Sequence, residues 1–185
     1  MVVPFVLLIL SLGAAVASVF LWGPVASAPL LLALICAVGA LFLLVLAPRR
    51  SRPRWIVVDG SNVMHWNDET PALETVGRVV EALQGRGYAP VVWFDANVGY
   101  RVGQRYMGPR PLANALGLPE RQVFVAPKGT PADPLLLRGS DRLKARVVTN
   151  DRFRDWVEDH PQVQEPGFLV RGHVRGGAVR LELAE

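Results

Sequence analysis

The stretch "WIVVDGSNV" (residues 55–63) decides the fold. Its first four residues are apolar, and Asp59, Gly60, Ser61 and Asn62 follow them without a spacer. A short, continuous apolar run is typical of a strand that is buried on both faces of a parallel sheet. Ligands of such sheets bind beyond the carboxyl ends of the strands, so Asp59 and Asn62 become candidate site residues.

Four more apolar runs follow, alternating with helical segments. This alternation predicts an α/β fold, a doubly wound three-layer α/β/α sandwich with a mainly parallel sheet. The tail "GHVRGGAVRLEL" (172–183) predicts a terminal hairpin that closes a sheet edge. The predicted helices are 70–85, capped by Thr70 with Pro71 in the first turn, then 109–116, 131–143 and 150–160. The further runs are "VVWF" (91–94), "VFVA" (123–126), "RVVT" (146–149) and "GFLV" (167–170).

Residues 1–48 form a separate apolar segment. No charged residue or histidine precedes Arg49, and residues 2–22 and 28–47 each approach the ~20 apolar residues that cross a bilayer as a helix. With the turn "GPVAS" (23–27) between them, they predict a transmembrane helical hairpin. A cleaved signal peptide is the alternative. It carries a positive n-region, whereas here nothing basic precedes the first stretch and a second one follows at once.

The basic juxtamembrane linker "RRSRPR" (49–54) follows the second stretch. Basic residues that flank a span stay on the cytoplasmic side, which predicts a multi-pass membrane protein with two spans and a cytoplasmic domain at 55–185. The linker arginines can also lie against anionic lipid headgroups of the bilayer. The chain's excess of four basic over acidic residues equals these four arginines, so the domain itself carries no excess charge. The only cysteine, Cys36, lies in the second stretch, which excludes disulfides and a cysteine-based zinc site in the domain.

Five aspartates map to one rim of the predicted sheet. Asp59 and Asp95 directly follow strands, and Asp133 begins the helix after the third strand. Asp151 is expected at the start of the helix after the fourth strand, with Asp155 one turn later on the same face. Crowded carboxylates repel one another unless a cation joins them, and Mg²⁺ or Mn²⁺ prefers carboxylate oxygen and water. The rim therefore predicts a Mg²⁺ or Mn²⁺ site, and no small-molecule cofactor is expected.

Each member of this set also has a purely structural interpretation. Asp133 and Asp151 can be helix N-caps, and Asp95 can merely start the loop "DANVGY" (95–100). "DGSN" (59–62) can be a tight turn, although the amide of Asn62 can also position a water or phosphate without adding charge. Capping does not require acids at the ends of three separate strands, so the set as a whole favours the metal site.

Three motifs together resemble the PIN-like NYN nucleases, specifically the Regnase-type ribonuclease domain. They are "VVDGSNV" (57–63), "PADP" (131–134) and "VVTNDRFRDW" (147–156), and the resemblance extends over about residues 55–183. It implies metal-dependent, endonucleolytic cleavage of single-stranded RNA. By the same resemblance the magnesium-binding acids are Asp59, Asp133, Asp151 and Asp155, and the active-site asparagine is Asn62.

The chain departs from the family pattern in two ways. Animal members have adjacent aspartates where this chain has Ala132 and Asp133, so one carboxylate is missing, and whether Asp95 replaces it is open. Animal members also hold RNA with a zinc finger, which the cysteine-free domain lacks.

Substrate-binding residues are predicted on the same rim. Arg101 and Arg105 stand with Arg110 and two tyrosines in a glycine-bearing stretch, and such cationic and aromatic residues suit single-stranded RNA. Solvated surface charge is the alternative for each cation, and His65 is either a proton-transfer residue or a surface or packing residue. The other predicted RNA contacts are Lys128, Arg152 and Arg154.

The leading hypothesis is a membrane-tethered, Mg²⁺- or Mn²⁺-dependent ribonuclease. A PIN-like module that holds RNA or a protein at the membrane without cutting is the second. A structure-selective DNA nuclease is the third, although the sequence offers no duplex-sized basic surface in its favour. A homodimer is compatible with each of them.

Overall fold

The computed structural model describes residues 2–22, 28–46, 53–67, 70–103 and 105–183. The chain divides into two compact units, Met1–Arg52 and Pro53–Glu185. The boundary between them falls inside the segment predicted to be a linker, and each unit has its own internal packing.

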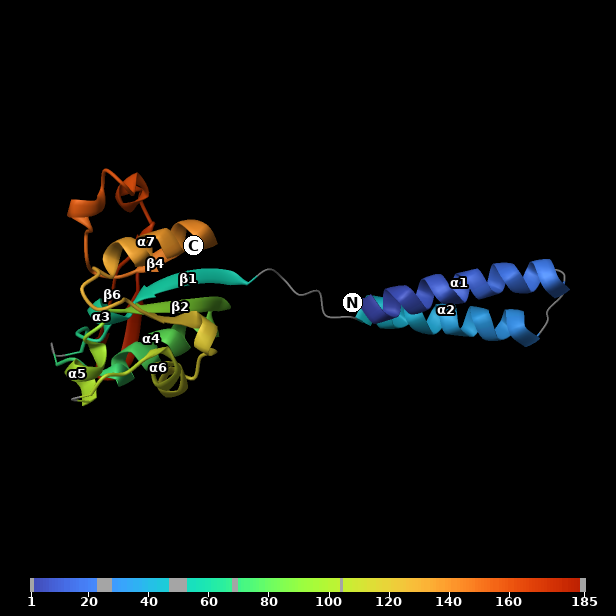
Figure 1. Ribbon diagram of the computed structural model, residues 1–185, viewed down its shortest axis with the longest axis horizontal. Helices are drawn as coiled ribbons and strands as arrows, with labels where there is room; N and C mark the ends of the chain where they lie inside the picture. The colour runs from blue at the N-terminus through green and yellow to red at the C-terminus, as the bar shows by residue number, and fades with distance from the viewer. Residues whose placement is uncertain (1, 23–27, 47–52, 68–69, 104, 184–185) are drawn as a thin grey trace. The chain divides into compact units, whose positions relative to one another are not determined.

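The first unit is a pair of packed helices, α1 (Val2–Trp22) and α2 (Ala28–Leu46) (Figure 1). Both are long and apolar enough to cross a membrane, whereas position 47 of the predicted second span lies outside the described residues. Ser11 donates its hydroxyl to the Leu7 carbonyl at 2.7 Å, which satisfies this polar group inside the helix. The buried residues of the pair are small: Ser11, Ser18, Ala33 and Ala40.

The second unit is built on a five-stranded parallel sheet with the order β3-β2-β1-β4-β5. The chain runs outward from β1 to β3 and then returns to β4 on the other side of β1. The carboxyl ends of β1 and β4 therefore flank the topological switch point, where open α/β sheets bind ligands. All five predicted runs form strands: β1 (Arg54–Asp59), β2 (Tyr88–Phe94), β3 (Val123–Val125), β4 (Arg146–Val148) and β5 (Leu169–Val170).

Helices cover both faces of this sheet, as Figure 1 shows. On one face lie α4 (Leu73–Gly85) and α6 (Pro109–Leu116), which pack on β2 and β3. On the other lies α7 (Asp133–Leu143), which packs over β1 and β4. Two short helices, α3 (Gly60–Val63) and α5 (Val98–Gly103), follow β1 and β2. This arrangement confirms the predicted doubly wound three-layer fold.

Two hydrophobic cores lie between these layers. Ile56 and Val58 of β1 belong to the core shared with α4 and α6, whereas Val57 belongs to the core shared with α7. All three side chains are fully buried. The alternation explains why the sequence of β1 is continuously apolar: successive residues face different cores.

The start of α4 and the place of the terminal hairpin differ from the predictions. Ala72 is the N-cap of α4, so Thr70 is not its cap. The predicted hairpin forms from β6 (Gly172–Arg175) and β7 (Ala178–Leu181), but it is a separate two-stranded sheet. Its Val174 N–H donates to the Trp66 carbonyl at 3.3 Å, which attaches the hairpin beyond β1 and not along a sheet edge.

The α-helix predicted over 150–160 is wrong. In its place the chain makes a bend, the 3₁₀ turn η2 (Arg154–Trp156) and then a second one, η3 (Pro161–Gln164). The Asp151 carboxylate accepts the main-chain N–H groups of Arg152 and Phe153, and Phe153 adopts a left-handed backbone with φ of 48°. These local bonds replace the helical ones, so Asp151 and Asp155 do not share a helical face.

Candidate functional site

Asp59 ends β1 and also caps the single helical turn of α3. Its Oδ1 accepts the main-chain N–H of Asn62 at 3.1 Å. Only glycine fits at position 60, because a Cβ there would lie 2.4 Å from the ring of Phe94. The motif is thus a tight turn, and that turn leaves the Asp59 carboxylate at the switch point of the sheet.

Thr149 connects Asp59 to Asp151 across the switch point. Its Oγ1 donates to Asp59 Oδ2 at 2.9 Å and accepts the Asp151 main-chain N–H at 3.0 Å. Thr149 is fully buried and Asp59 is 8% exposed, whereas Asp151 is exposed. One hydroxyl therefore links the buried Asp59 carboxylate to the main chain of the exposed Asp151.

Asn62 holds α3 against the loop that follows β4. Its Oδ1 accepts hydrogen bonds from the Trp66 indole and from the Asn150 main-chain N–H, each at 2.9 Å. The Asn150 side chain in turn exchanges two bonds with the main chain of Gly172, at 2.9 and 3.2 Å. Because the oxygen of Asn62 is occupied, its amide nitrogen is the end available to a ligand.

Asp133 is the first residue of α7, with Ala132 at the N-cap, so Asp133 itself is not the N-cap. It is half-buried, and the side chain of Trp156 hydrogen-bonds to it. This contact places η2, and with it the exposed Asp155, beside the start of α7.

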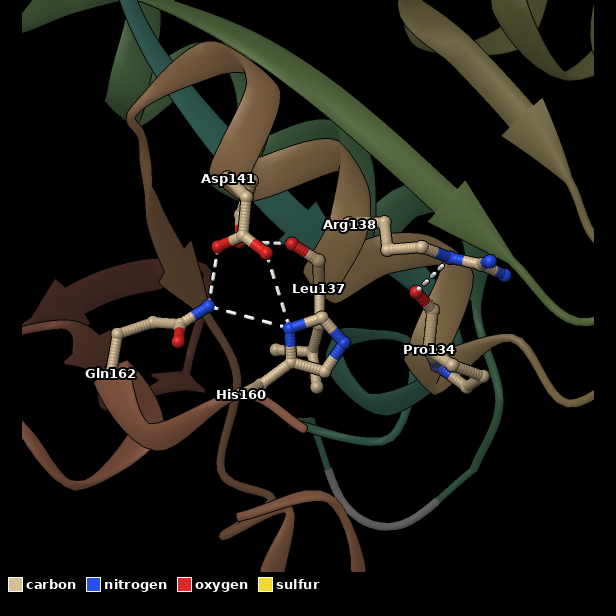
Figure 2. Close-up of polar contacts among 7 residues, drawn as sticks. Pro134, Leu137, Arg138, Asp141, His160 and Gln162 are labelled. Atoms are coloured by element: carbon tan, nitrogen blue, oxygen red, sulfur yellow. Dashed lines mark hydrogen bonds and ion pairs between the residues drawn. The ribbon is translucent and has the colours of Figure 1, made fainter. Parts of the chain in front are cut away.

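A polar cluster further along α7 fastens the same segment (Figure 2). His160 Nδ1 lies 3.1 Å from Asp141 Oδ2, and the Gln162 side chain donates to the same carboxylate. His160 is buried, so the cluster anchors the segment's far end firmly to the helix. Residues 156–162 are thereby attached to α7 at Asp133 and at Asp141.

Asp95 follows β2 and joins the same region through α3. Its main-chain N–H donates to Ser61 Oγ at 2.8 Å, and its side chain is half-buried. Ser61 thus ties the end of β2 to the turn that begins at Asp59.

Burial and mutual repulsion perturb two of the acids. Burial raises the pKa of Asp59 to about 7, although the bonds from Asn62 and Thr149 counteract part of this rise. The charges of Asp133 and Asp95 raise the pKa of Asp59 further. Burial also raises the pKa of Asp133, and the charges of Asp151, Asp95 and Asp155 add to that rise. All five predicted acids therefore lie within electrostatic range of Asp59 or Asp133.

This donor set suits a hard divalent cation by its chemistry. Every candidate ligand is a carboxylate oxygen, and a cation would relieve the repulsion that raises the pKa values of Asp59 and Asp133. In the described ranges, no three acidic, histidine or cysteine side chains are grouped so as to hold an ion by themselves. Mg²⁺ is commonly bound through only one or two carboxylates, with water or phosphate oxygens completing its shell.

The predicted RNA-binding cations are all exposed. Arg101 lies in α5, where its guanidinium is 3.3 Å from Nε2 of His65, so these two candidates are neighbours. The remaining exposed cations lie in loops or at turns: Arg105, Lys128, Arg152 and Arg154.

Four residues at the site were not predicted from the sequence. Thr149, Asn150 and Ser61 are polar residues within two positions of a predicted acid, and this proximity in the sequence was the available signal. Arg171 directly follows β5, and its guanidinium donates to the Asp151 carbonyl at 2.7 Å. A cation at the end of a strand adjoining β4 was the corresponding signal for Arg171.

Comparison with known proteins yields a family and a fold. Residues 52–166 match the family described as the Zc3h12a-like Ribonuclease NYN domain. No curated protein matches the chain. Two solved structures of the Arabidopsis thaliana nuclear protein-only RNase P 2 (PRORP2) are similar in fold. One has a TM-score of 0.51 and 20% sequence identity over 83% of this chain. The other has a TM-score of 0.53 and 16% sequence identity over 95% of this chain. The chain spans about a third of PRORP2, 34% and 36% respectively.

Proposed function

The chain belongs to the Zc3h12a-like ribonuclease NYN domain family, and on that premise we propose that it is a membrane-anchored, metal-dependent ribonuclease. It hydrolyses phosphodiester bonds within single-stranded RNA. The observation that carries this proposal is the convergence of acidic charge near the switch point. The negative charges of Asp95, Asp151 and Asp155 raise the pKa of Asp59, of Asp133 or of both.

In this proposal Asp59, Asp133 and Asp151 hold Mg²⁺ or Mn²⁺, with Asp155 and Asp95 acting directly or through water. The bound cation supplies positive charge for the phosphate and lowers the pKa of water. Asn62 presents its amide nitrogen to the phosphate, because its oxygen is occupied by Trp66 and Asn150. Thr149 keeps the buried Asp59 aligned with Asp151. The exposed cations Arg101, Arg105, Lys128, Arg152 and Arg154 attract the RNA backbone.

The two apolar helices are the proposed anchor. Their outward side chains are large and apolar, such as Phe20 at 87% and Val45 at 75% exposure, which is unfavourable in water and favourable in lipid. The arginines at 49–54 favour a cytoplasmic position for the catalytic domain. Protease accessibility of the domain in sealed inside-out and right-side-out vesicles tests this orientation.

A cleavage assay of labelled single-stranded RNA tests the activity. Asp151→Asn retains an oxygen for the Arg152 and Phe153 N–H groups but removes the charge, so it should abolish cleavage while leaving the fold intact. Asp159→Asn, which removes an exposed acid from the same segment, is the matched control and should cleave normally. Wild-type turnover by Asp151→Asn, or equal cleavage with and without Mn²⁺, would contradict the proposal.

The second candidate function is a non-catalytic module that holds RNA or a protein at the membrane. Ala132 favours it, because this residue is buried beside Asp133 and supplies no carboxylate. Calorimetric titration with Mn²⁺ separates the two: binding that is lost in Asp151→Asn supports the enzyme. RNA binding without any Mn²⁺ binding supports the module.

A further inference from the structure

A trough lies on the α7 face of the sheet, away from the acidic rim. The helix α7 packs over β1 and β4, and β2 and β3 form the floor of the trough beside it. Its opposite wall is the 3₁₀ turn η1 (Glu120–Gln122), which precedes β3. Its volume is about 310 Å³, at the lower end of the range that small ligands occupy.

The floor of the trough is aromatic. Trp93 of β2 and Phe124 of β3 stack with ring centroids 4.7 Å apart and planes inclined by 16°. Phe124, at the centre of the edge strand β3, is 38% exposed, so the face of this large apolar side chain is open to a ligand. Gly139 lets the backbone of α7 approach Trp93, because a Cβ there would lie 3.1 Å from the indole nitrogen. Trp55 completes the apolar lining.

Two arginines stand on opposite walls of the trough. Arg121 comes from η1 and Arg142 from the last turn of α7, and both are exposed. Within the described part of the chain neither guanidinium has a hydrogen bond or an ion pair. A guanidinium binds phosphate through two parallel hydrogen bonds, and an aromatic face stacks on a nucleobase.

We propose that this trough binds a nucleotide of single-stranded RNA, with the base on Phe124 and Trp93 and the flanking phosphates on Arg142 and Arg121. The proposal rests on the proposed ribonuclease function, because it assigns the trough to the same RNA strand. An apolar protein partner is disfavoured, since it would bury two guanidinium groups without a counter-charge.

An RNA strand that crosses the acidic rim can also reach the trough. Trp93 precedes Asp95 by two strand residues, about 7 Å. Arg142 lies nine helical residues from Asp133, about 14 Å along α7. RNA whose scissile phosphate lies at the acids can therefore place a nucleotide a few positions away in the trough, which then determines how long a substrate must be to bind well.

Fluorescence anisotropy with the full-length chain in detergent micelles tests the proposal. The probe is a labelled RNA of roughly twelve unstructured nucleotides, in excess EDTA, so that binding is measured without cleavage. Arg142→Gln and Phe124→Leu should each raise Kd roughly tenfold, the size expected for losing one stacked or paired nucleotide contact. Phe124→Leu keeps an apolar side chain, and thermal melts check that both variants fold.

Arg138→Gln is the matched control. Arg138 is also exposed on α7, one turn before Arg142, but it donates to the Pro134 carbonyl and does not line the trough (Figure 2). Its Kd should equal that of the wild type. Photocrosslinking with 4-thiouridine RNA should in addition label the peptide that contains Phe124.

The outcomes separate this inference from the proposed function. A tenfold loss of binding in a protein that never cleaves RNA upholds the trough and overturns the enzyme. Unchanged Kd in folded Arg142→Gln and Phe124→Leu overturns the trough, whether or not the protein cleaves. A shift in oligomeric state for Arg142→Gln without any effect on RNA also overturns it, and assigns the surface to a contact between copies of the chain.

Discussion

Replacing Asp59 by asparagine is expected to stabilise the domain at neutral and alkaline pH while abolishing cleavage. Burial raises the pKa of Asp59 from 3.8 to about 7, so the folded domain retains a proton that the unfolded chain has released. The free energy of unfolding therefore falls as the pH rises between these two values, and it stays lowered above them. Asparagine keeps the shape of the side chain and one acceptor oxygen but has no charge to bury.

The size of the effect follows from the pKa shift. One pKa unit corresponds to about 1.4 kcal/mol, so a rise from 3.8 to about 7 lowers the free energy of unfolding by about 4 kcal/mol at pH 8. From about pH 5 to pH 8, the stability advantage of Asp59→Asn should grow by about 3 kcal/mol. Losing the Thr149 bond costs the variant about 1 kcal/mol at every pH, which does not change this growth.

Urea denaturation of the Pro53–Glu185 unit, without divalent metal, measures this difference at several pH values. The unit contains both hydrophobic cores, so it can be studied apart from the apolar helices. Asp159→Asn controls for the loss of an exposed acid and should not show the pH-dependent gain. Parallel stability curves for Asp59→Asn and the wild type between pH 5 and 8 would refute the reasoning.

Four further results are expected. Gly60→Ala should destabilise the domain by about 1–3 kcal/mol in urea denaturation, because the added Cβ would collide with the buried Phe94 ring. Gly77→Ala is the control: it lies in α4 with open space around it, and it should stabilise the domain by up to about 1 kcal/mol. Thr149→Val should raise the pKa of Asp59 further, since the hydroxyl bond lowers it, and carboxyl NMR titration measures this; an unchanged pKa would contradict the assigned bond. Mn²⁺ should bind more tightly at pH 8 than at pH 6, because protonated Asp59 cannot be a ligand, and a pH-independent calorimetric affinity would exclude Asp59. Asn150→Ala should accelerate amide hydrogen exchange at Val174 in the hairpin, while exchange at Val58 stays slow.

The strands of the sheet could be predicted from the sequence because each one is marked by residues that are adjacent in the chain. Each strand is a short apolar run, and Asp59 and Asp95 directly follow two of them, so their position at the carboxyl ends followed from counting residues. The helix Pro109–Leu116 was predicted to the residue, since proline starts it and Gly117 ends it with a left-handed backbone.

The remaining parts depend on contacts between distant residues. The prediction of a helix at 150–160 failed because Asp151 bonds to its own neighbours, and because Trp156 and His160 attach to α7. The pattern of apolar and polar residues along the sequence does not reveal such bonds. The placement of the terminal hairpin likewise depends on Asn150 and Trp66, which are remote from it in the sequence.

The pair formed by Asn150 and Gly172 has a consequence for the order of events in the cell. Translation produces the apolar helices first, and the loop beside Asn62 gains its hairpin partner only after Gly172 has left the ribosome. Insertion of the proposed membrane anchor can thus precede completion of the acidic rim. Under the proposed function, delivery to the membrane therefore comes before the acidic rim is complete enough to cut RNA.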